Sequence, residues 1–128
     1  MASVRGTNTK PEIVVRKLVH ALGFRFRLHR KDLPGCPDLV FPSRRKVIFV
    51  HGCFWHRHKG CKRASTPQTR LDFWQKKFES NVLRDQRNLR DLSAAGWEAL
   101  LVWECSLKDT NRLVERLQRF LSAPAKSP

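Results

Sequence analysis

The sequence predicts an α/β fold in which a mixed β-sheet carries helices on both faces. Three observations lead to this prediction. Two β-rich segments follow one another across a short turn, which is typical of an antiparallel hairpin. A long amphipathic helical segment then leads to another apolar, β-rich segment, so that strand is reached by a helical crossover. Further amphipathic helical segments stand before the hairpin and after the last strand, which supplies helices for both faces.

The first helix is expected to follow Thr9, because residues 9–12, Thr-Lys-Pro-Glu, have the pattern of a capping box with proline in the first turn. Gly23 supplies a natural C-terminal stop. Between them, apolar residues recur at intervals of three and four, which predicts one buried helix face. These apolar positions are Val15, Leu18, Val19 and Leu22.

Three short strands are expected next. Residues 24–29 alternate between apolar and basic side chains, which predicts a strand with one buried face. Residues 38–41 and 47–50 are apolar and β-rich, and the turn at residues 42–45 between them predicts the antiparallel hairpin.

The second half of the chain is expected to contain two helices and one strand. Residues 69–95 have a helical pattern, either continuous or interrupted near Ser80, and Gly96 ends it. Residues 97–103 contain an apolar run that is typical of a central strand, and residues 110–122 form a last amphipathic helix. The predicted element order is therefore αβββαβα. The apolar stripe of the long helix comprises Leu71, Trp74, Phe78, Val82, Leu89 and Leu92.

The length of 128 residues is enough for one compact domain. We expect a single domain over residues 1–128, with residues 1–8 a flexible basic arm and residues 123–128 a disordered tail. No apolar run approaches the ~18 residues of a membrane span, and the N-terminus lacks the apolar stretch of a secretory signal. These features predict a cytoplasmic protein with no membrane partner.

The charge balance predicts a nucleic-acid partner. Lysine and arginine number 26 against 11 acidic residues, which gives a formal charge of +15. Such a surface gains binding energy by neutralising phosphates and releasing their counterions. A solvated basic face or an anionic membrane is the alternative, but no basic amphipathic helix stands out as a membrane binder.

Residues 51–61, His-Gly-Cys-Phe-Trp-His-Arg-His-Lys-Gly-Cys, combine three kinds of chemistry. Thiol and imidazole groups at short spacing can close around Zn²⁺. The adjacent aromatics Phe54 and Trp55, amid basic residues, suit stacking on bases or wedging between them, although they could instead form a local core on the zinc. Trp74 lies on a helical stripe, where a core position is the default.

A closed zinc site is predicted from Cys53-x4-His58-x2-Cys61 followed by Cys105. Cys53 and Cys105 each come just after a predicted strand, so they meet if those strands are neighbours. Four nitrogen and sulfur ligands make a structural site, because a catalytic zinc keeps an open position. Scattered buried thiols are the alternative, and Cys36 is left over.

Asp38 is the candidate catalytic carboxylate. Aspartate is a poor strand residue, yet it opens an apolar strand after Pro37, where it could hold Mg²⁺ or simply cap a turn. The predicted hairpin would place His51 and His56 nearby, and a metal-bound water beside a neutral imidazole suits phosphodiester hydrolysis. A second protein ligand would be a backbone carbonyl, or Glu12 through water. By contrast, His20 and His29 are expected to be surface or satisfied residues.

Taken together, these segments resemble the very short patch repair (Vsr) DNA mismatch endonucleases over nearly the whole chain. The motifs that carry the resemblance are Arg5-Gly6-x-x-Thr9-Lys10-Pro11-Glu12, Leu33-Pro34-Gly35-x-Pro37-Asp38-Leu39-Val40, Val47-Ile48-Phe49-Val50-His51-Gly52-Cys53-Phe54-Trp55-His56, Phe73-Trp74, Asn81-Val82 with Arg84-Asp85, and Val102-Trp103-Glu104-Cys105.

The resemblance implies a restriction-endonuclease-like αβββαβ core and a strand-specific nick 5′ to the thymine of a T:G mismatch, which arises when 5-methylcytosine deaminates. It implies Asp38 as the metal carboxylate, with the main-chain carbonyl of Val50 as second Mg²⁺ ligand. A monomer on double-stranded DNA is expected, with mismatch-repair proteins as further candidate partners. A zinc-stabilised DNA-binding module, or a nuclease of this fold with another lesion or site, is the alternative. The remaining implied roles are His56 as base with His51 assisting, Glu12 in the active site, Phe54, Trp55 and Trp74 as an aromatic wedge, and Cys53, His58, Cys61 and Cys105 as zinc ligands.

Overall fold

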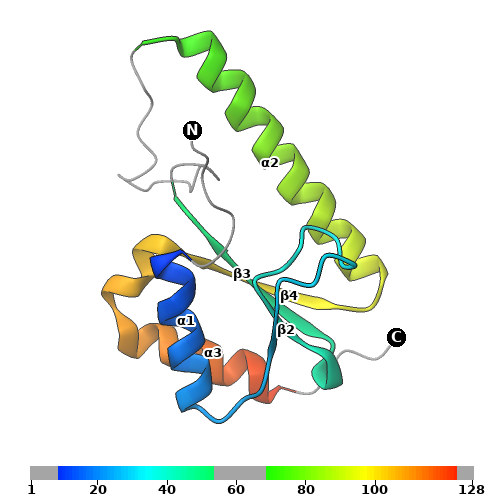
Figure 1. Ribbon diagram of the computed structural model, residues 1–128, viewed down its shortest axis with the longest axis vertical. Coiled ribbons are helices and arrows are strands. Elements are labelled where there is room, and N and C mark those ends of the chain that lie inside the picture. The colour runs from blue at the N-terminus through cyan, green and yellow to red at the C-terminus, as the bar shows by residue number, and fades with distance from the viewer. Residues whose placement is uncertain (1–8, 54–68, 124–128) are drawn as a thin grey trace.

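A computed structural model describes residues 9–53 and 69–123, and their elements follow the predicted order αβββαβα (Figure 1). The expected basic arm and most of the expected tail lie outside the described residues. Two short 3₁₀ segments, η1 and η3, follow β2 and β4. The elements are α1 Lys10–Ala21, β1 Arg27–Leu28, β2 Leu39–Phe41, η1 Pro42–Arg44, β3 Lys46–His51, α2 Leu71–Ala94, β4 Glu98–Trp103, η3 Glu104–Lys108 and α3 Thr110–Ser122.

Within the described residues, the strands form one mixed sheet in the order β1-β2-β3-β4. Strands β2 and β3 pair antiparallel, which confirms the hairpin, and β4 runs parallel to β3 after the α2 crossover. The expectation of a central position for β4 is wrong, because β4 lies at the edge of this sheet. Its apolar run reflects helices packed on both faces of the sheet rather than a strand on each side.

The first strand is shorter than the alternating pattern predicts. Only Arg27–Leu28 pair with β2, and Leu28 is 40% exposed. Phe24 and Phe26 still pack against the core. The alternation of apolar and basic side chains therefore indicates a segment at the edge of the sheet with one half-buried face. Alternation predicts which side chains turn inward, whereas strand length depends on a partner, and β2 begins only at Leu39.

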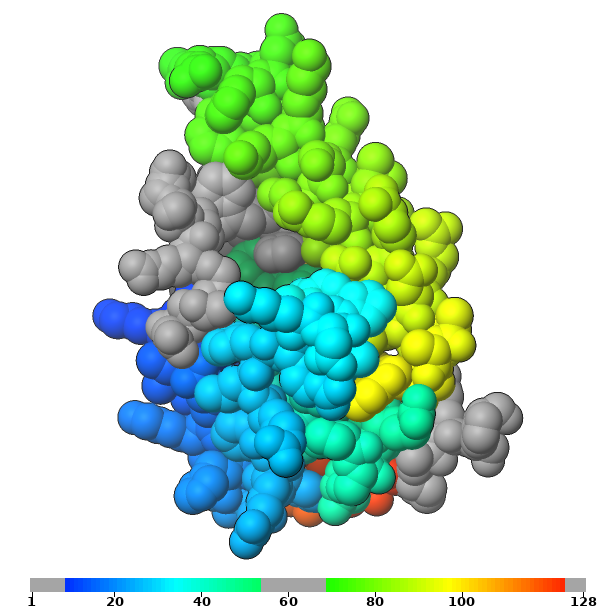
Figure 2. Space-filling model, turned by 45° about the vertical axis from the view of Figure 1, so that its right-hand side comes forward, coloured from blue at the N-terminus to red at the C-terminus, as the bar shows by residue number. Residues whose placement is uncertain are grey.

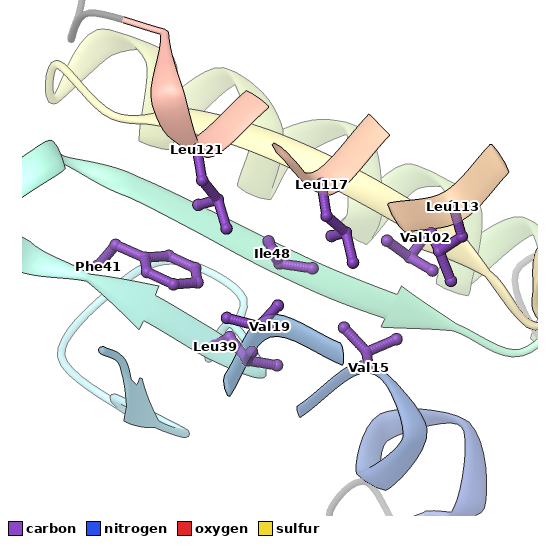
Figure 3. Packing of buried hydrophobic residues seen from close by; sticks show 9 residues of the cluster. All are labelled: Val15, Val19, Leu39, Phe41, Ile48, Val102, Leu113, Leu117 and Leu121. Atoms are coloured by element: carbon purple, nitrogen blue, oxygen red, sulfur yellow. The ribbon is translucent and has the colours of Figure 1, made fainter. Parts of the chain in front are cut away.

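Helices α1 and α3 cover one face of the sheet with a continuous hydrophobic core (Figure 3). Thr9 caps α1 by accepting a hydrogen bond from the backbone N–H of Glu12, and Gly23 follows the helix at φ +91°, which confirms both predicted ends. The side chains of α1, α3 and three strands point toward one another. This core comprises Val15, Val19, Leu39, Phe41, Ile48, Val102, Leu113, Leu117 and Leu121.

Helix α2 lies on the opposite face of the sheet and is continuous through Ser80. Its C-terminal part packs on the sheet through Leu89 and Leu92, and Gly96 follows it at φ +87°. The N-terminal end projects away from the sheet (Figure 1), and Phe73 is exposed there. Leu83, near the middle of the helix, is also exposed. None of the helices in the described residues is long and apolar enough to cross a membrane.

Candidate active site

Asp38 lies immediately before β2 and is largely buried. Its Oδ2 atom accepts a hydrogen bond from the backbone N–H of Val50 at 2.7 Å. This side-chain hydrogen bond extends the pairing of β2 with β3 by one step before β2 begins at Leu39. The predicted closeness of Asp38 to the strand that ends at His51 is confirmed, because the hairpin register pairs Leu39 with Ile48.

Glu12 projects from the first turn of α1, and its side chain is only 1% exposed. Its carboxylate forms an ion pair with Arg16 on the same helix face and lies 2.6 Å from Nε2 of His29. One possible ligand atom from each of Glu12, His29 and Asp38 lies within 4.8 Å of the others. The structure therefore places a buried carboxylate from α1 beside the carboxylate that opens β2.

His29 is the site residue that the sequence analysis missed. It follows β1 at φ +48°, its backbone N–H donates to the Asp38 carbonyl at 3.4 Å, and its side chain is 18% exposed. The expectation of a surface or satisfied residue agrees with the hydrogen bond of its ring to Glu12, but this partner is 17 residues away in the sequence and was not foreseen. The one local signal is its place at the end of the alternating segment.

The surroundings of Asp38 favour the protonated form of its carboxyl group. Burial raises the pKa of Asp38 to about 7, and the Val50 N–H opposes this rise, while the negative charge of Glu12 and a hydrogen bond between the two carboxyl groups add to it. Two carboxylates in one desolvated place repel each other unless a proton or a cation lies between them. This donor set therefore fits a divalent cation, whose charge would offset both the cost of desolvating the carboxylates and the repulsion between them.

His51 ends β3 and is almost fully buried, at 6% exposure. Its ring contacts Trp103 edge-on with centroids 5.2 Å apart and Phe49 at 5.7 Å. His51 and Asp38 line the same cavity, so the prediction that the hairpin brings them to one place is confirmed. His56 lies outside the described residues.

A cavity of about 530 Å³ opens above Asp38, and Figure 2 shows the hollow with β3 at its floor. The loop before β2 forms one wall and α2 forms the other. Gly35, at φ +79°, brings this loop against α2, where a Cβ atom would meet Asn88 at 2.9 Å. Polar and charged side chains from both walls line it, namely Lys31, Arg84, Asp85 and Asn88.

Two of the four predicted zinc ligands lie in the described residues. Cys53 is buried just after β3, and Cys105 is half-buried just after β4. These strands are parallel neighbours, with His51 opposite Trp103, so both cysteines follow the same end of the sheet. The other two predicted ligands, His58 and Cys61, lie outside the described residues.

The described member of the predicted aromatic wedge is Trp74 on α2. It is half-buried and belongs to a row of rings, with Phe78 stacked on it at 5.8 Å and Phe73 edge-on at 5.3 Å. The other predicted members, Phe54 and Trp55, lie outside the described residues.

Comparisons with known proteins agree with this architecture. Residues 1–63 match the family model described as DNA mismatch endonuclease Vsr. The type II nicking enzyme V.XorIIP of Xanthomonas oryzae pv. oryzae is 56% identical, over 94% of this chain and 88% of its own length. The DNA mismatch endonuclease Vsr of Escherichia coli is 39% identical, over 94% of this chain and 80% of its own. The catalytic domain of the homing endonuclease I-Bth0305I has a similar fold, with a TM-score of 0.63 and 19% identity, covering 88% of this chain and 94% of that domain.

Proposed function

Because the chain belongs to the Vsr family of DNA mismatch endonucleases and is a nicking endonuclease, we propose that it nicks double-stranded DNA 5′ to the thymine of a T:G mismatch. Such mismatches arise when 5-methylcytosine deaminates, and the nick would start very short patch repair. The large excess of lysine and arginine supports a DNA substrate, because phosphate contacts supply most sequence-independent affinity.

The observation that carries this proposal is the Asp38 carboxylate, which accepts a hydrogen bond from the Val50 N–H, lies beside Glu12 and lines the cavity. In a β-strand, the N–H and C=O groups of one residue point toward the same neighbouring strand. Because the Val50 N–H points toward Asp38, the Val50 carbonyl would face the same side. Asp38 and this carbonyl would together hold Mg²⁺, with Glu12 acting through water. Bound there, Mg²⁺ would supply positive charge for the phosphoryl transition state and activate water.

The histidines would handle protons in this reaction. His56 is proposed as the base that accepts a proton from the attacking water, with His51 assisting from the cavity wall. The packing of His51 between Phe49 and Trp103 fixes its ring without needing the substrate. Such a preset position lowers the entropic cost of reaching the reactive geometry.

Mismatch recognition is proposed to rest on the aromatic wedge of Phe54, Trp55 and Trp74. A T:G wobble pair is easier to unstack than a Watson–Crick pair, and an inserted ring offsets that cost with contacts of about 1–3 kcal/mol per base. The contacts of Trp74 with the rings of Phe73 and Phe78 support this role, because they fix its position near the projecting end of α2.

The proposed Zn²⁺ is structural, with Cys53, His58, Cys61 and Cys105 as ligands. Metal analysis of the purified protein should find about one Zn²⁺ per chain, and Cys105→Ser should lower zinc content and melting temperature together. Cys36→Ser is the matched control, because Cys36 lines the cavity with Asp38 and is not a proposed ligand. Unchanged zinc in Cys105→Ser would show that the ligand set is wrong.

One of the two alternatives stays open. A zinc-stabilised DNA-binding module without catalysis does not agree with family membership, because the relatives are nicking enzymes and an endonuclease. A nuclease of this fold with another lesion or site remains the competing function. We further propose that the activity belongs to one endonuclease domain, working as a monomer in the bacterial cytoplasm.

Nicking assays on end-labelled duplexes test the proposal. Each duplex would carry one of the possible mismatches or none, with Mg²⁺ or with EDTA. We expect one nick 5′ to the thymine in the T:G duplex only, with Mg²⁺ only. Equal nicking of other mismatches or of matched DNA would favour the competing function.

The Asp38 variant tests the active site within the same assay. Asp38→Asn should lower the nicking rate by about 10²-fold or more while T:G binding survives, because only the cation anchor is removed. Asp91→Asn, an exposed aspartate on α2, is the matched control and should nick normally. Normal turnover by Asp38→Asn would exclude this site.

A further inference from the structure

His29 has no role in the proposed reaction, yet it lies against the catalytic carboxylates. Its Nε2 atom is 2.6 Å from Glu12, and its backbone N–H donates to the Asp38 carbonyl at 3.4 Å. Ligand atoms of all three residues lie within 4.8 Å of one another. Two donors bound to one cation at about 2.0–2.6 Å are at most about 5 Å apart, so these three already stand within the reach of one ion.

We propose that Glu12, His29 and Asp38 form a cation site with two carboxylate donors and one imidazole, and that this site binds Mn²⁺ more tightly than Mg²⁺. The inference rests on the proposed function, because Asp38 also serves the proposed catalytic centre. It makes His29 and Glu12 direct metal ligands, in place of the contact of Glu12 through water, so the ion at this end of the sheet would be bound by nitrogen as well as oxygen.

The position of each donor is fixed by a different part of the fold. Glu12 is held on α1 by its ion pair with Arg16, which compensates the carboxylate without help from His29. Asp38 is held at the head of β2 by the Val50 N–H. His29 is placed by its backbone bond to Asp38 at a positive φ. A cation would replace the His29–Glu12 hydrogen bond with little movement of the backbone.

The donor set decides which cation fits best. Mg²⁺ demands oxygen ligands in near-ideal octahedral geometry and usually keeps several waters. Imidazole is a borderline ligand that suits transition ions, and Mn²⁺ also accepts carboxylate, carbonyl and water oxygen. A partly buried site with two carboxylates and one imidazole therefore favours Mn²⁺. Mn²⁺ is also a suitable probe, because thiolate sites select softer ions such as zinc.

Metal titration of the purified, zinc-containing protein tests the proposal without relying on activity. Isothermal calorimetry with Mn²⁺ and with Mg²⁺, and electron paramagnetic resonance of bound Mn²⁺, would compare wild type with His29→Gln. Glutamine keeps an N–H donor for Glu12 but removes the imidazole. His20→Gln is the matched control, because His20 is exposed on α1.

We expect wild type to bind Mn²⁺ more tightly than Mg²⁺, and His29→Gln to weaken Mn²⁺ binding by about tenfold or more with little change for Mg²⁺. Tenfold is the lower end of the loss seen when a group that supports a metal ligand is removed. His20→Gln should bind both ions as wild type does. If His29→Gln fails to fold by circular dichroism, His29→Asn takes its place with the same expectations.

Unchanged Mn²⁺ binding by a folded His29→Gln protein would overturn the inference and leave His29 as a hydrogen-bond partner of Glu12. Equally tight binding of Mn²⁺ and Mg²⁺ by wild type would overturn the claimed preference, and equal losses of both ions in His29→Gln would overturn His29 as its cause. Each of these results leaves the proposed nicking intact, because that function depends on Asp38. Normal nicking by Asp38→Asn would instead sink the proposed function, whatever the titrations show.

Discussion

The two faces of the sheet are built differently. The face under α1 and α3 is closed by a continuous set of nine buried apolar side chains. The face under α2 buries a smaller apolar cluster, Val40, Val47, Phe49 and Leu92, and leaves a cavity of about 530 Å³ lined partly by charged groups. The first face supplies stability, while the second leaves room for a substrate beside Asp38.

The length of α2 explains much of this difference. Its 24 residues span about 36 Å, whereas the six residues of β3 or β4 span about 20 Å. One end of the helix therefore has no sheet to cover. The exposed Leu71 and Phe73 lie in its first turn, and the exposed Leu83 lies near its middle. A projecting helix that carries aromatic rings and basic residues is suited to meet DNA.

The largest effect on stability is expected in the closed face. Leu117 is fully buried on the sheet-facing side of α3, so Leu117→Ala should lower the free energy of unfolding by about 2–5 kcal/mol. Leu83 on α2 is 58% exposed, and Leu83→Ala should change the free energy of unfolding by no more than about 0.5 kcal/mol. Urea denaturation of both variants measures the difference. Similar losses at the two sites would show that α2 is as tightly packed as α3.

The pH dependence of stability should come from the cavity side. Burial raises the pKa of Asp38 to about 7 from an unfolded value near 3.8, so the folded protein keeps a proton that the unfolded chain releases. In the absence of divalent cations, stability should therefore fall as pH rises from about 4 to 7. The loss should reach a few kcal/mol, since one pKa unit corresponds to about 1.4 kcal/mol.

Thermal unfolding of the zinc-containing protein without added divalent cations, between pH 5 and pH 8, measures this loss. Asp38→Asn should flatten the profile, because asparagine does not titrate, whereas Asp91→Asn should keep the wild-type slope. A divalent cation should restore stability mainly at pH 8, where the empty site is charged. If the stability of the wild type rises with pH while that of Asp38→Asn does not, the pKa of Asp38 is not raised in the folded protein.

A smaller effect is expected at the projecting end of α2. Trp74→Ala should weaken binding to a T:G duplex by about 1–3 kcal/mol, because a base-stacking ring is lost, and should change binding to matched DNA much less. The salt dependence should stay the same, since no phosphate contact is removed. Leu83→Ala is the control, because Leu83 lies two and a half turns along α2, on the opposite side of the helix.

Fluorescence anisotropy with both duplexes at several salt concentrations would measure these affinities. If a folded Trp74→Ala protein still prefers T:G duplex over matched DNA, Trp74 does not contact the mismatch and serves only to pack against Phe78. Equal losses on T:G and matched DNA would have the same meaning.

Local features of the fold were predictable because their causes are local. Thr9 and Gly23 mark the ends of α1 through capping and a positive φ, and both signals act within one helical turn. The turn at residues 42–45 likewise fixes the hairpin, and the hairpin brings Asp38 beside Val50. The sequence by itself therefore determined the element order, most of the inward-facing residues and the meeting of Asp38 with His51, while Leu71 of the predicted stripe is exposed.

Tertiary structure alone decided what depends on partners distant in the sequence. The alternation of residues 24–29 cannot show that β2 starts late enough to leave only two of them paired, and an apolar run cannot show whether β4 lies at the centre or the edge. The same holds for His29, whose contact with Glu12 depends on the packing of another element. Short-range patterns record which side chains are buried and how the chain turns, whereas a site of converging donors exists only once separate elements pack together.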